Sequence, residues 1–112
     1  EIWLWNPLVL TKSKTGDQIA IVKNDYTPFL KGQYFLPGTA KMVKTKPKTY
    51  DFKHSITHHD IYVTLLPTHS KIATDLHSEI KKKKSSKWIK TKELSQWIPA
   101  SLIKKAVQLG LN

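Results

Sequence analysis

Apolar and β-branched residues form strand-like runs in the first half of the chain. The first two runs, residues 5–11 and 18–23, are separated by KSKTGD, whose Gly-Asp pair gives the backbone freedom of a hairpin turn. A third run, YFL at residues 34–36, stops at a Pro-Gly pair. This pattern predicts an N-terminal β-hairpin followed by a short strand.

A polar stretch separates these runs from a fourth predicted strand. Residues 39–53 contain Pro47 and have no helical apolar period, so we expect a basic loop with a short strand at residues 41–43. Over residues 60–65 apolar side chains alternate with more polar ones, which is the period of a half-buried strand. We therefore interpret HSITHH, residues 54–59, as a loop that leads into this strand.

The last third of the chain carries helical patterns. Ile72, Leu76 and Ile80 recur every four residues and predict one apolar stripe of a short helix, with an irregular connection as the alternative. KWIK, residues 87–90, predicts a final strand, and Thr91 then stands at the N-cap of a one-turn helix.

The best-marked helix is the last one. Pro99 suits its first position, and Gly110 is expected to end it. Its apolar face comprises Leu102, Ile103, Ala106 and Val107. Four strands, a short helix, a strand and a helix in this order predict an α+β domain with a mixed or mostly antiparallel sheet and a C-terminal helix.

Composition bounds the organisation of the chain. With 112 residues and 39% hydrophobic content, it is large enough for a single folded domain, 1–112, and too short for two. The absence of Cys excludes a disulfide framework and a thiolate metal site, and it favours the cytoplasm. No apolar run reaches the roughly 18 residues that span a bilayer, so we expect no membrane partner. Since the chain starts at Glu1 and not at Met, we expect a fragment of a longer protein.

The charge is strongly basic and comes from lysine alone. Nineteen Lys against eight acidic residues give a formal net charge of +11, which predicts a polyanionic partner. Lysine is suited to neutralising phosphates rather than to bidentate reading of base edges. One cluster is predicted to contact a DNA backbone: Lys41, Lys44, Lys46, Lys48 and Lys53. The role of a second run, residues 81–84, is left open, and a merely solvated surface is the alternative for both clusters.

Residues 54–60 contain side chains of the types used in catalysis and metal binding, but neither role is favoured. The five His lack the carboxylate or thiolate partners that would complete a zinc site. Ser55, His54 and Asp60 have the atoms of a catalytic triad, but triads are defined by geometry, so a hydrogen-bonded polar loop is the simpler interpretation. We expect no catalytic residue, no metal site and no cofactor in this chain.

The stretch YFLPG, residues 34–38, is similar to the one that precedes the catalytic helix of Nudix hydrolases. That helix needs closely spaced Glu to hold divalent cations near a diphosphate. Here residues 39–53 contain Asp51 as their only acidic residue. Diphosphate hydrolysis is therefore excluded on chemical grounds.

Three longer stretches follow one another in a familiar order: IAIVKNDYTPFLKGQYFLPG (19–38), HSITH (54–58) and KWIKTKELSQWIPASLIKKAV (87–107). Together they resemble the C-terminal domain of the MutY family, the adenine DNA glycosylases that remove adenine mispaired with 8-oxoguanine. Each motif is short, so the specificity lies in their succession over nearly the whole chain. The resemblance implies a Nudix-like domain without hydrolase activity, which wraps the DNA opposite the catalytic domain and helps to recognise the lesion.

The resemblance also implies roles for residues 54–58. The family motif is H-x-F-[ST]-H, so Thr57 falls on the hydroxyl residue that meets the Hoogsteen side of the lesion. Ile56 falls on the Phe and would act as an apolar wedge beside it. His54 and His58 would organise the loop and contact phosphates, with Ser55 as a further site residue. A hydroxyl can accept a hydrogen bond from N7–H of 8-oxoguanine, whereas guanine has an acceptor at that position.

The implied partners are double-stranded DNA with 8-oxoguanine opposite adenine and the protein's own N-terminal catalytic domain. The glycosylase chemistry and an iron–sulfur cluster belong to that absent domain, so this chain alone is expected to excise nothing. The resemblance places the protein in the bacterial cytoplasm, at the nucleoid.

Several positions depart from the family pattern. Tyr34 replaces the usual Trp, Ile56 replaces Phe, and Asn24 stands where a basic residue is common. The insert between Gly38 and His54 is too short for the helix of many relatives. Two alternatives therefore remain: a stand-alone basic Nudix-like module that binds nucleic acid or a nucleotide without hydrolysis, and a protein-interaction domain whose Lys only confer solubility.

Overall fold

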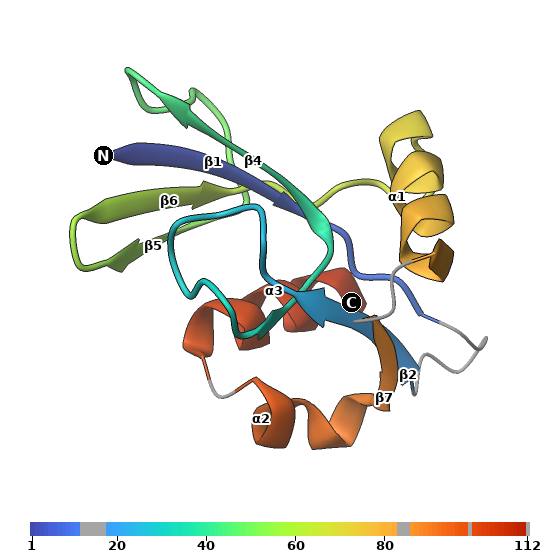
Figure 1. Cartoon of the computed structure of the whole chain (residues 1–112). Coiled ribbons are helices and arrows are strands. Elements are labelled where there is room, and N and C mark those ends of the chain that lie inside the picture. Colours follow the sequence, from blue (N-terminus) through green and yellow to red (C-terminus); the bar gives the residue numbers. More distant parts are fainter. Residues whose placement is uncertain (12–17, 83–85, 99, 112) are drawn as a thin grey trace.

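The computed structural model describes residues 1–11, 18–82, 86–98 and 100–111 (Figure 1). The strands are β1 (Ile2–Pro7), β2 (Gln18–Lys23), β3 (Tyr34–Phe35), β4 (Gly38–Val43), β5 (Phe52–Ile56), β6 (His59–Val63) and β7 (Lys87–Lys90). The helices are α1 (Lys71–Lys82), the 3₁₀ turn η1 (Thr91–Glu93), α2 (Leu94–Trp97) and α3 (Ser101–Leu111). The predicted α+β class and the C-terminal helix are confirmed.

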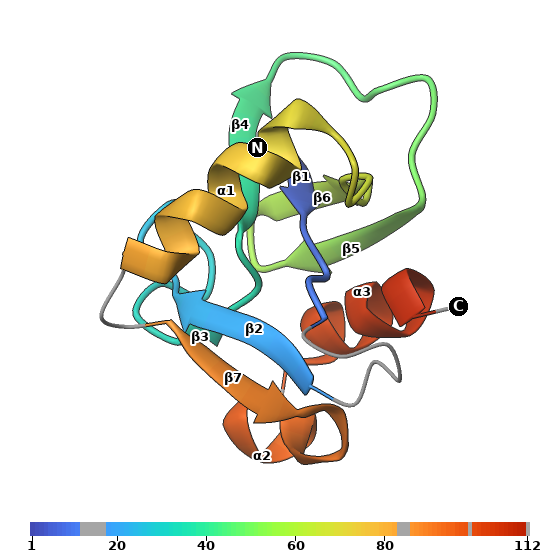
Figure 2. The ribbon, with the colours of Figure 1, turned by 90° about the vertical axis from the view of Figure 1, so that its right-hand side faces the viewer.

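The strands form two sheets (Figure 2). The larger sheet has the order β4-β1-β6-β5, and the smaller has the order β3-β2-β7. β1 pairs antiparallel with β4 and parallel with β6, whereas the remaining strand pairs are antiparallel. The larger sheet is therefore mixed, which is one of the two alternatives that the order of elements left open.

β1 is an interior strand of the larger sheet, between β4 and β6. Its side chains point alternately to the two faces of the sheet. Trp5 is fully buried on the core side and stacks on Phe35, with ring centroids 4.7 Å apart. Trp3 points to the same side and packs against the core. Ile2 and Leu4 fall on the other side, which we call the outer face of the larger sheet.

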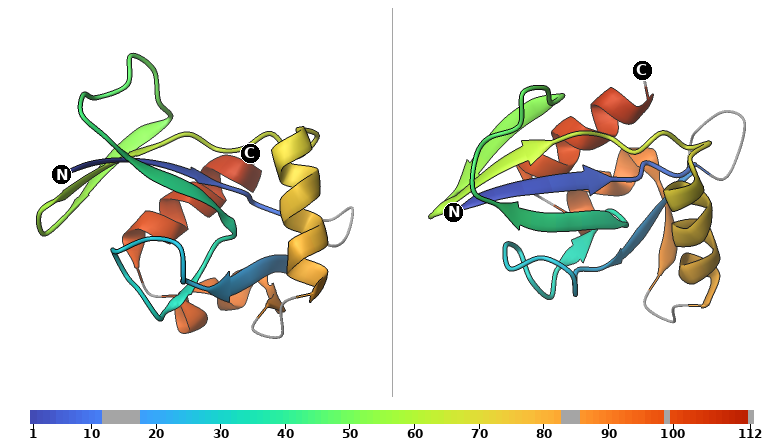
Figure 3. Two further views of the ribbon diagram at one scale, coloured as in Figure 1. Left: turned by 45° about the horizontal axis from the view of Figure 1, so that its top comes forward. Right: turned by 90° about the horizontal axis from the view of Figure 1, so that it is seen from above.

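One cluster of buried side chains joins the two sheets with α2 and α3. From α3 it takes the predicted apolar face: Leu102, Ile103, Ala106 and Val107. α1 lies at the end of the larger sheet that is remote from the β5–β6 turn (Figure 3). The prediction of a helix in this segment is confirmed. Its buried side chains include Ala73 and Ile80, whereas Ile72, which was predicted to lie on the apolar stripe, is half exposed.

A buried relay of hydrogen bonds ties the β2–β3 loop to the core. The indole N–H of Trp5 donates to the Tyr26 hydroxyl at 2.9 Å, and this hydroxyl donates to the Leu36 carbonyl at 2.6 Å. Burial raises the pKa of Tyr26 above its ordinary value. The hydroxyl therefore stays protonated and serves as donor and acceptor at once.

The predicted N-terminal hairpin is wrong. β1 and β2 belong to different sheets. Within the described part of the chain, their continuations meet at a bridge between Thr11 and Ile19 and at a 3.0 Å bond from Ala20 N–H to Leu10 O. Both runs are apolar enough to form strands, but β1 finds its partners in β4 and β6, much later in the chain. The predicted turn, residues 12–17, lies outside the described residues.

Three further expectations need correction. HSITHH is not a loop that feeds a strand, since it forms the facing ends of β5 and β6 and their turn. Thr91 is the first residue of η1, and Lys90 occupies the N-cap position.

Gly110 does not end α3, which continues to Leu111. An added Cβ at Gly110 would lie 2.5 Å from Cγ2 of Val9, so the glycine allows close packing instead. Pro99 lies outside the described residues.

Gly38→Ala is expected to lower the free energy of unfolding by about 2 kcal/mol. A Cβ at this position would meet the backbone oxygen of Asn6 and lie 2.9 Å from Cα of Pro7, so the β1–β4 ladder would have to move. Urea unfolding measures the effect. Thr39→Ala, at the next and exposed position of β4, is the control and should change stability by less than about 0.5 kcal/mol. Equal effects of the two variants would contradict the packing argument.

Candidate nucleic-acid interface

The β5–β6 hairpin ends in a two-residue turn, Thr57 and His58, closed by the pair Ile56 and His59. Both turn side chains are exposed. Thr57 has φ 51°, in the left-handed region, whereas His58 does not have a positive φ. Hairpin turns that need a positive φ normally have glycine, Asn or Asp at that position.

Thr57 is therefore held in a strained conformation. A β-branched residue is unfavourable at positive φ because its Cβ approaches the following carbonyl oxygen. The ladder between β5 and β6 fixes the turn on both sides and so imposes this conformation. Backbone strain of this kind is concentrated at functional sites. Thr57 is also exposed at the end of the hairpin, which makes this turn a candidate contact point for a partner.

On the outer face, the hairpin is fastened by polar side chains. The Ser55 hydroxyl donates to Oδ1 of Asp60 at 3.0 Å, across the two strands. Nζ of Lys53 lies 4.0 Å from the same oxygen. Ser55 thus has a partner within the hairpin and supports the turn from its base.

On the inner face, the hairpin contacts the rest of the domain. Ile56 is half-buried and packs against the core cluster, together with Phe52. Ile56, which the MutY resemblance makes an apolar wedge, is therefore anchored by its packing at the base of the turn and is not a fully exposed tip.

His54 lies on this inner face, close to α3. Burial lowers the pKa of His54, and the positive charge of Lys105 on α3 lowers it further. His54 is therefore neutral at neutral pH and cannot act as a cationic phosphate partner there. Lys105 was missed in the sequence, because the pattern of the last helix only predicts that this residue faces water. The packing of α3 beneath β5 is what brings it to the hairpin.

Stability is expected to decline in acid because of His54. Its pKa in the folded protein lies below the ordinary value of 6.5, so the unfolded chain binds more protons. The contribution is fully present above pH 6.5 and is lost as the pH falls through the lower, folded value. Urea unfolding of the wild type and His54→Gln at pH 8 and pH 5 measures it. Lys105→Gln should raise the His54 pKa in an NMR titration, and an unchanged pKa would exclude the Lys105 contribution.

His59 has a structural role beside the turn. Nδ1 of His59 lies 3.1 Å from a carboxylate oxygen of Glu1, which also accepts the indole N–H of Trp3 at 3.2 Å. Its ring packs against those of Trp3 and Phe29. The N-terminal strand thus supports the hairpin on the side opposite β5.

Two of the predicted DNA-contacting lysines lie on the outer face of the larger sheet. The registers align Lys41, Leu4, Tyr62 and Lys53 in one row across the four strands. Neighbouring strands are about 4.8 Å apart, so the backbones of Lys41 and Lys53 are separated by about 14 Å. Both lysines are exposed, and Nζ of Lys53 lies 5.7 Å from the centre of the Tyr62 ring.

The other three predicted lysines stand on the connection from β4 to β5. This connection, residues 44–51, joins the two edge strands of the sheet. It passes on the outer side, because Tyr50 packs edge-to-face on Tyr62 at 4.8 Å. Its end is fixed by Asp51, whose carboxylate accepts Leu65 N–H at 2.7 Å. All three of its lysines are exposed: Lys44, Lys46 and Lys48.

The second lysine run lies elsewhere. Lys82 is at the end of α1, and residues 83–84 lie outside the described residues. Lys87, on β7, has its ammonium 4.8 Å from the centre of the Trp97 ring and 5.6 Å from that of Tyr34. Lys87 is thus held by aromatic rings on the smaller sheet. It does not join the lysines of the outer face.

Catalysis by residues 54–60 is not supported by the geometry. His54 and Ser55 are neighbours in a strand, so their side chains point to opposite faces. The Ser55 hydroxyl is bonded to Asp60 and not to an imidazole. Among the described residues, no group of three or more His, Asp or Glu side chains could hold a metal ion.

Comparison with known proteins adds no relative. No family model matches the chain. No curated protein matches it. Within the described residues, no helix is long and apolar enough to cross a membrane.

The predicted lesion residues divide into three groups. Thr57 and His58 form the exposed turn, His54 and Ile56 face the core side, and Ser55 faces the outer side. The hairpin brings them within one short segment, in which Ser55 and the two turn residues are exposed, whereas His54 and Ile56 are partly buried. The candidate interface consists of this turn and the lysines of the outer face.

Proposed function

We propose that this chain is a non-catalytic DNA-binding domain of an adenine glycosylase, which recognises 8-oxoguanine opposite a mispaired adenine. The observation that carries the proposal is the strained and exposed Thr57 at the end of a hairpin flanked by lysines. Strained backbone conformations cluster at active sites, ligand clamps and switch regions. The order of the three MutY-like motifs supports the proposal independently.

The chemistry of recognition follows from the turn. The hydroxyl of Thr57 accepts a hydrogen bond from N7–H of 8-oxoguanine, and its backbone N–H is available as a donor beside it. Guanine presents an acceptor at N7 and has no oxygen at C8, so the hydroxyl would have to reverse its hydrogen bond and the backbone N–H would lose its acceptor. A buried polar group left without a partner costs about 1–3 kcal/mol, which sets the scale of discrimination.

The lysines of the outer face hold the phosphate backbone while the turn contacts the base. Such contacts position a protein on the duplex and carry no sequence information. Five phosphate contacts would give a slope of about −4.5 in a plot of log affinity against log salt. Lysine, with its compact charge, suits this role.

The same proposal covers the wider setting of the chain. The domain would be Nudix-like, would act in the cytoplasm at the bacterial nucleoid, and would work beside its own N-terminal catalytic domain. It would have no cofactor of its own, since an iron–sulfur cluster belongs to that catalytic domain. Base excision repair would then need both parts of the protein.

Binding to two duplexes over a salt series tests the proposal. One duplex carries adenine opposite 8-oxoguanine and the other carries adenine opposite guanine. Tighter binding to the first, with a steep salt dependence on both, is the expected result. Lys41→Gln combined with Lys53→Gln should reduce the salt slope by about 2. The control pair, Lys71→Gln with Lys90→Gln, should leave the slope nearly unchanged.

Two other results would reject it. Equal binding of both duplexes with the same salt slope would favour a basic module that binds nucleic acid without reading the lesion. No binding at low salt would mean that the lysines only confer solubility.

A further inference from the structure

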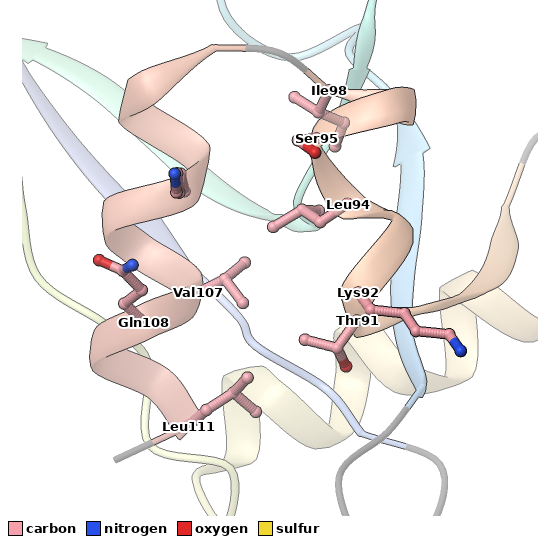
Figure 4. Close-up of a pocket in the computed structure, with 9 residues that line it drawn as sticks. Thr91, Lys92, Leu94, Ser95, Ile98, Val107, Gln108 and Leu111 are labelled. Carbon is pink, nitrogen blue, oxygen red and sulfur yellow. The ribbon is translucent and has the colours of Figure 1, made fainter.

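A cavity of about 250 Å³ lies between α3 on one side and η1 with α2 on the other (Figure 4). Val107 and Leu111 project into it from α3, and Leu94 and Ile98 face them from the opposite wall. These four side chains make an apolar floor. The cavity is separate from the β5–β6 hairpin turn, which lies at a different end of the molecule (Figure 1).

The rim of the cavity is polar and basic. It is formed by Thr91, Lys92, Ser95, Lys104 and Gln108. The stem of Lys92 borders the opening, and its chain leads outward from it (Figure 4). Among the described residues, neither Lys92 nor Lys104 has a carboxylate within 4.0 Å. One uncompensated cation therefore stands on each wall, and a bound group outside the cavity would meet positive charge.

The size of the cavity limits its occupant. Sites for drug-sized ligands and cofactors occupy about 300–1,000 Å³, so this cavity is too small for them. It suits one or two apolar side chains. Leu111 is 40% exposed at the opening, which leaves apolar surface for such a group to cover.

Nucleic acid does not fit this site. Single-stranded nucleic acid is held by aromatic platforms that stack on bases, and none of the described residues that line the cavity is aromatic. A duplex could meet only the two lysines of the rim and would leave the apolar floor uncovered. The combination of apolar floor and basic rim instead matches a groove that binds a helix with apolar anchors and acidic neighbours.

We propose that this cavity is a docking site for an acidic amphipathic segment of a partner protein, with an apolar side chain in the cavity and carboxylates at Lys92 and Lys104. The net charge of +11 attracts such a segment over a distance. Docking here leaves the turn and the lysines of the outer face free for DNA. The proposal is independent of the DNA-binding function and would survive its rejection.

The test uses the whole 112-residue protein and a synthetic probe. The probe is a fluorescently labelled helical peptide of about three turns, with Leu at the spacing of one helix face and Glu elsewhere. Fluorescence anisotropy should show saturable binding. A peptide with Lys in place of Glu, and a peptide with Ala in place of Leu, should both bind much more weakly. If either of these peptides binds as well as the probe, the proposal is overturned.

Protein variants locate the binding. Lys92→Glu combined with Lys104→Glu should weaken probe binding about fivefold or more, since two attractive contacts become repulsive. Lys31→Glu combined with Lys71→Glu changes the net charge by the same amount at exposed positions outside the cavity and should have less than about a twofold effect. Equal losses in the two double variants would overturn the proposal, because binding would then follow net charge alone.

A third variant tests whether the apolar side chains of the cavity are needed for binding, and whether a second copy of this chain occupies the cavity instead. Leu111→Glu places a carboxylate at the opening and should abolish probe binding, and circular dichroism should show an unchanged fold. Sedimentation of the wild type without peptide should give a monomer. A dimer that Leu111→Glu dissociates would overturn the proposal in favour of a second copy of this chain as the occupant.

Discussion

Thr57→Gly is expected to raise the free energy of unfolding by about 1 kcal/mol and to reduce the preference for 8-oxoguanine about tenfold. Stability rises because glycine adopts the φ of 51° without strain. Discrimination falls because the hydroxyl that accepts N7–H is removed. If Thr57 served the fold alone, its replacement would not increase stability and reduce lesion preference together. Measuring both quantities therefore distinguishes a role in recognition from a role in folding.

Two conservative variants complete this prediction. Thr57→Ala keeps the strained Cβ and removes the hydroxyl, so it should lose discrimination without gaining as much stability as glycine. Thr57→Ser keeps the hydroxyl without the β-branch and should retain discrimination. Urea unfolding and competition binding with the two duplexes measure all three variants. Loss of discrimination in Thr57→Ser, or its retention in Thr57→Gly, would remove the hydroxyl from the recognition mechanism.

Asn24→Ala is expected to lower the free energy of unfolding by about 4 kcal/mol. Asn24 is 2% exposed and organises the loop between β2 and β3. Its amide donates to Oγ1 of Thr27 at 2.7 Å and to Phe29 O at 2.8 Å, and its side-chain oxygen accepts from the backbone N–H groups of Tyr26 and Thr27. Truncation would leave several of these groups buried without a partner.

Asn6→Ala is the matched control for this loss. The Asn6 amide donates to a single backbone oxygen, that of Thr64, at 2.9 Å in an exposed setting. Its removal should cost less than about 1 kcal/mol, because water can replace the lost partner. Thermal or urea unfolding compares the two variants. Similar losses would mean that the buried network of Asn24 contributes little.

Asn24 is also one of the positions at which the chain departs from the MutY pattern that it resembles. A basic residue is common there in that family, whereas in this chain the position is buried and bonded to its own loop. A lysine at this site would have to bury its charge or disrupt the loop. Asn24 therefore shapes the loop and cannot contact DNA directly.

The sequence predicted most of the elements but not which strands pair. Periodicity marks β6, α1, β7 and α3 because each has one buried face or stripe, and this information is local. Pairing of β1 with β4 and β6 depends on residues some forty and sixty positions away, which no local pattern contains. The Gly-Asp signal after β1 favoured the wrong neighbour for that reason.

The candidate site was predicted in part for the same reason. The polar residues at 54–58 were found by composition, but the face on which each lies depends on the hairpin register. A shift of that register by one residue would turn the side chain of His54 to the outer face and that of Ser55 to the core side. Lys105 was missed because its approach to His54 is a property of helix packing and leaves no mark on the sequence.

The position of β1 fixes where a preceding polypeptide would join the domain. Ile2 pairs with Val43 and Asp60, and the carbonyl of Glu1 accepts Asp60 N–H at 2.7 Å. Any chain that leads into Glu1 therefore enters at the same edge as the Thr57 turn. A domain fused there through a short linker would be held at high effective concentration next to whatever the turn binds. In such a fusion, a longer linker should weaken this coupling without changing either domain.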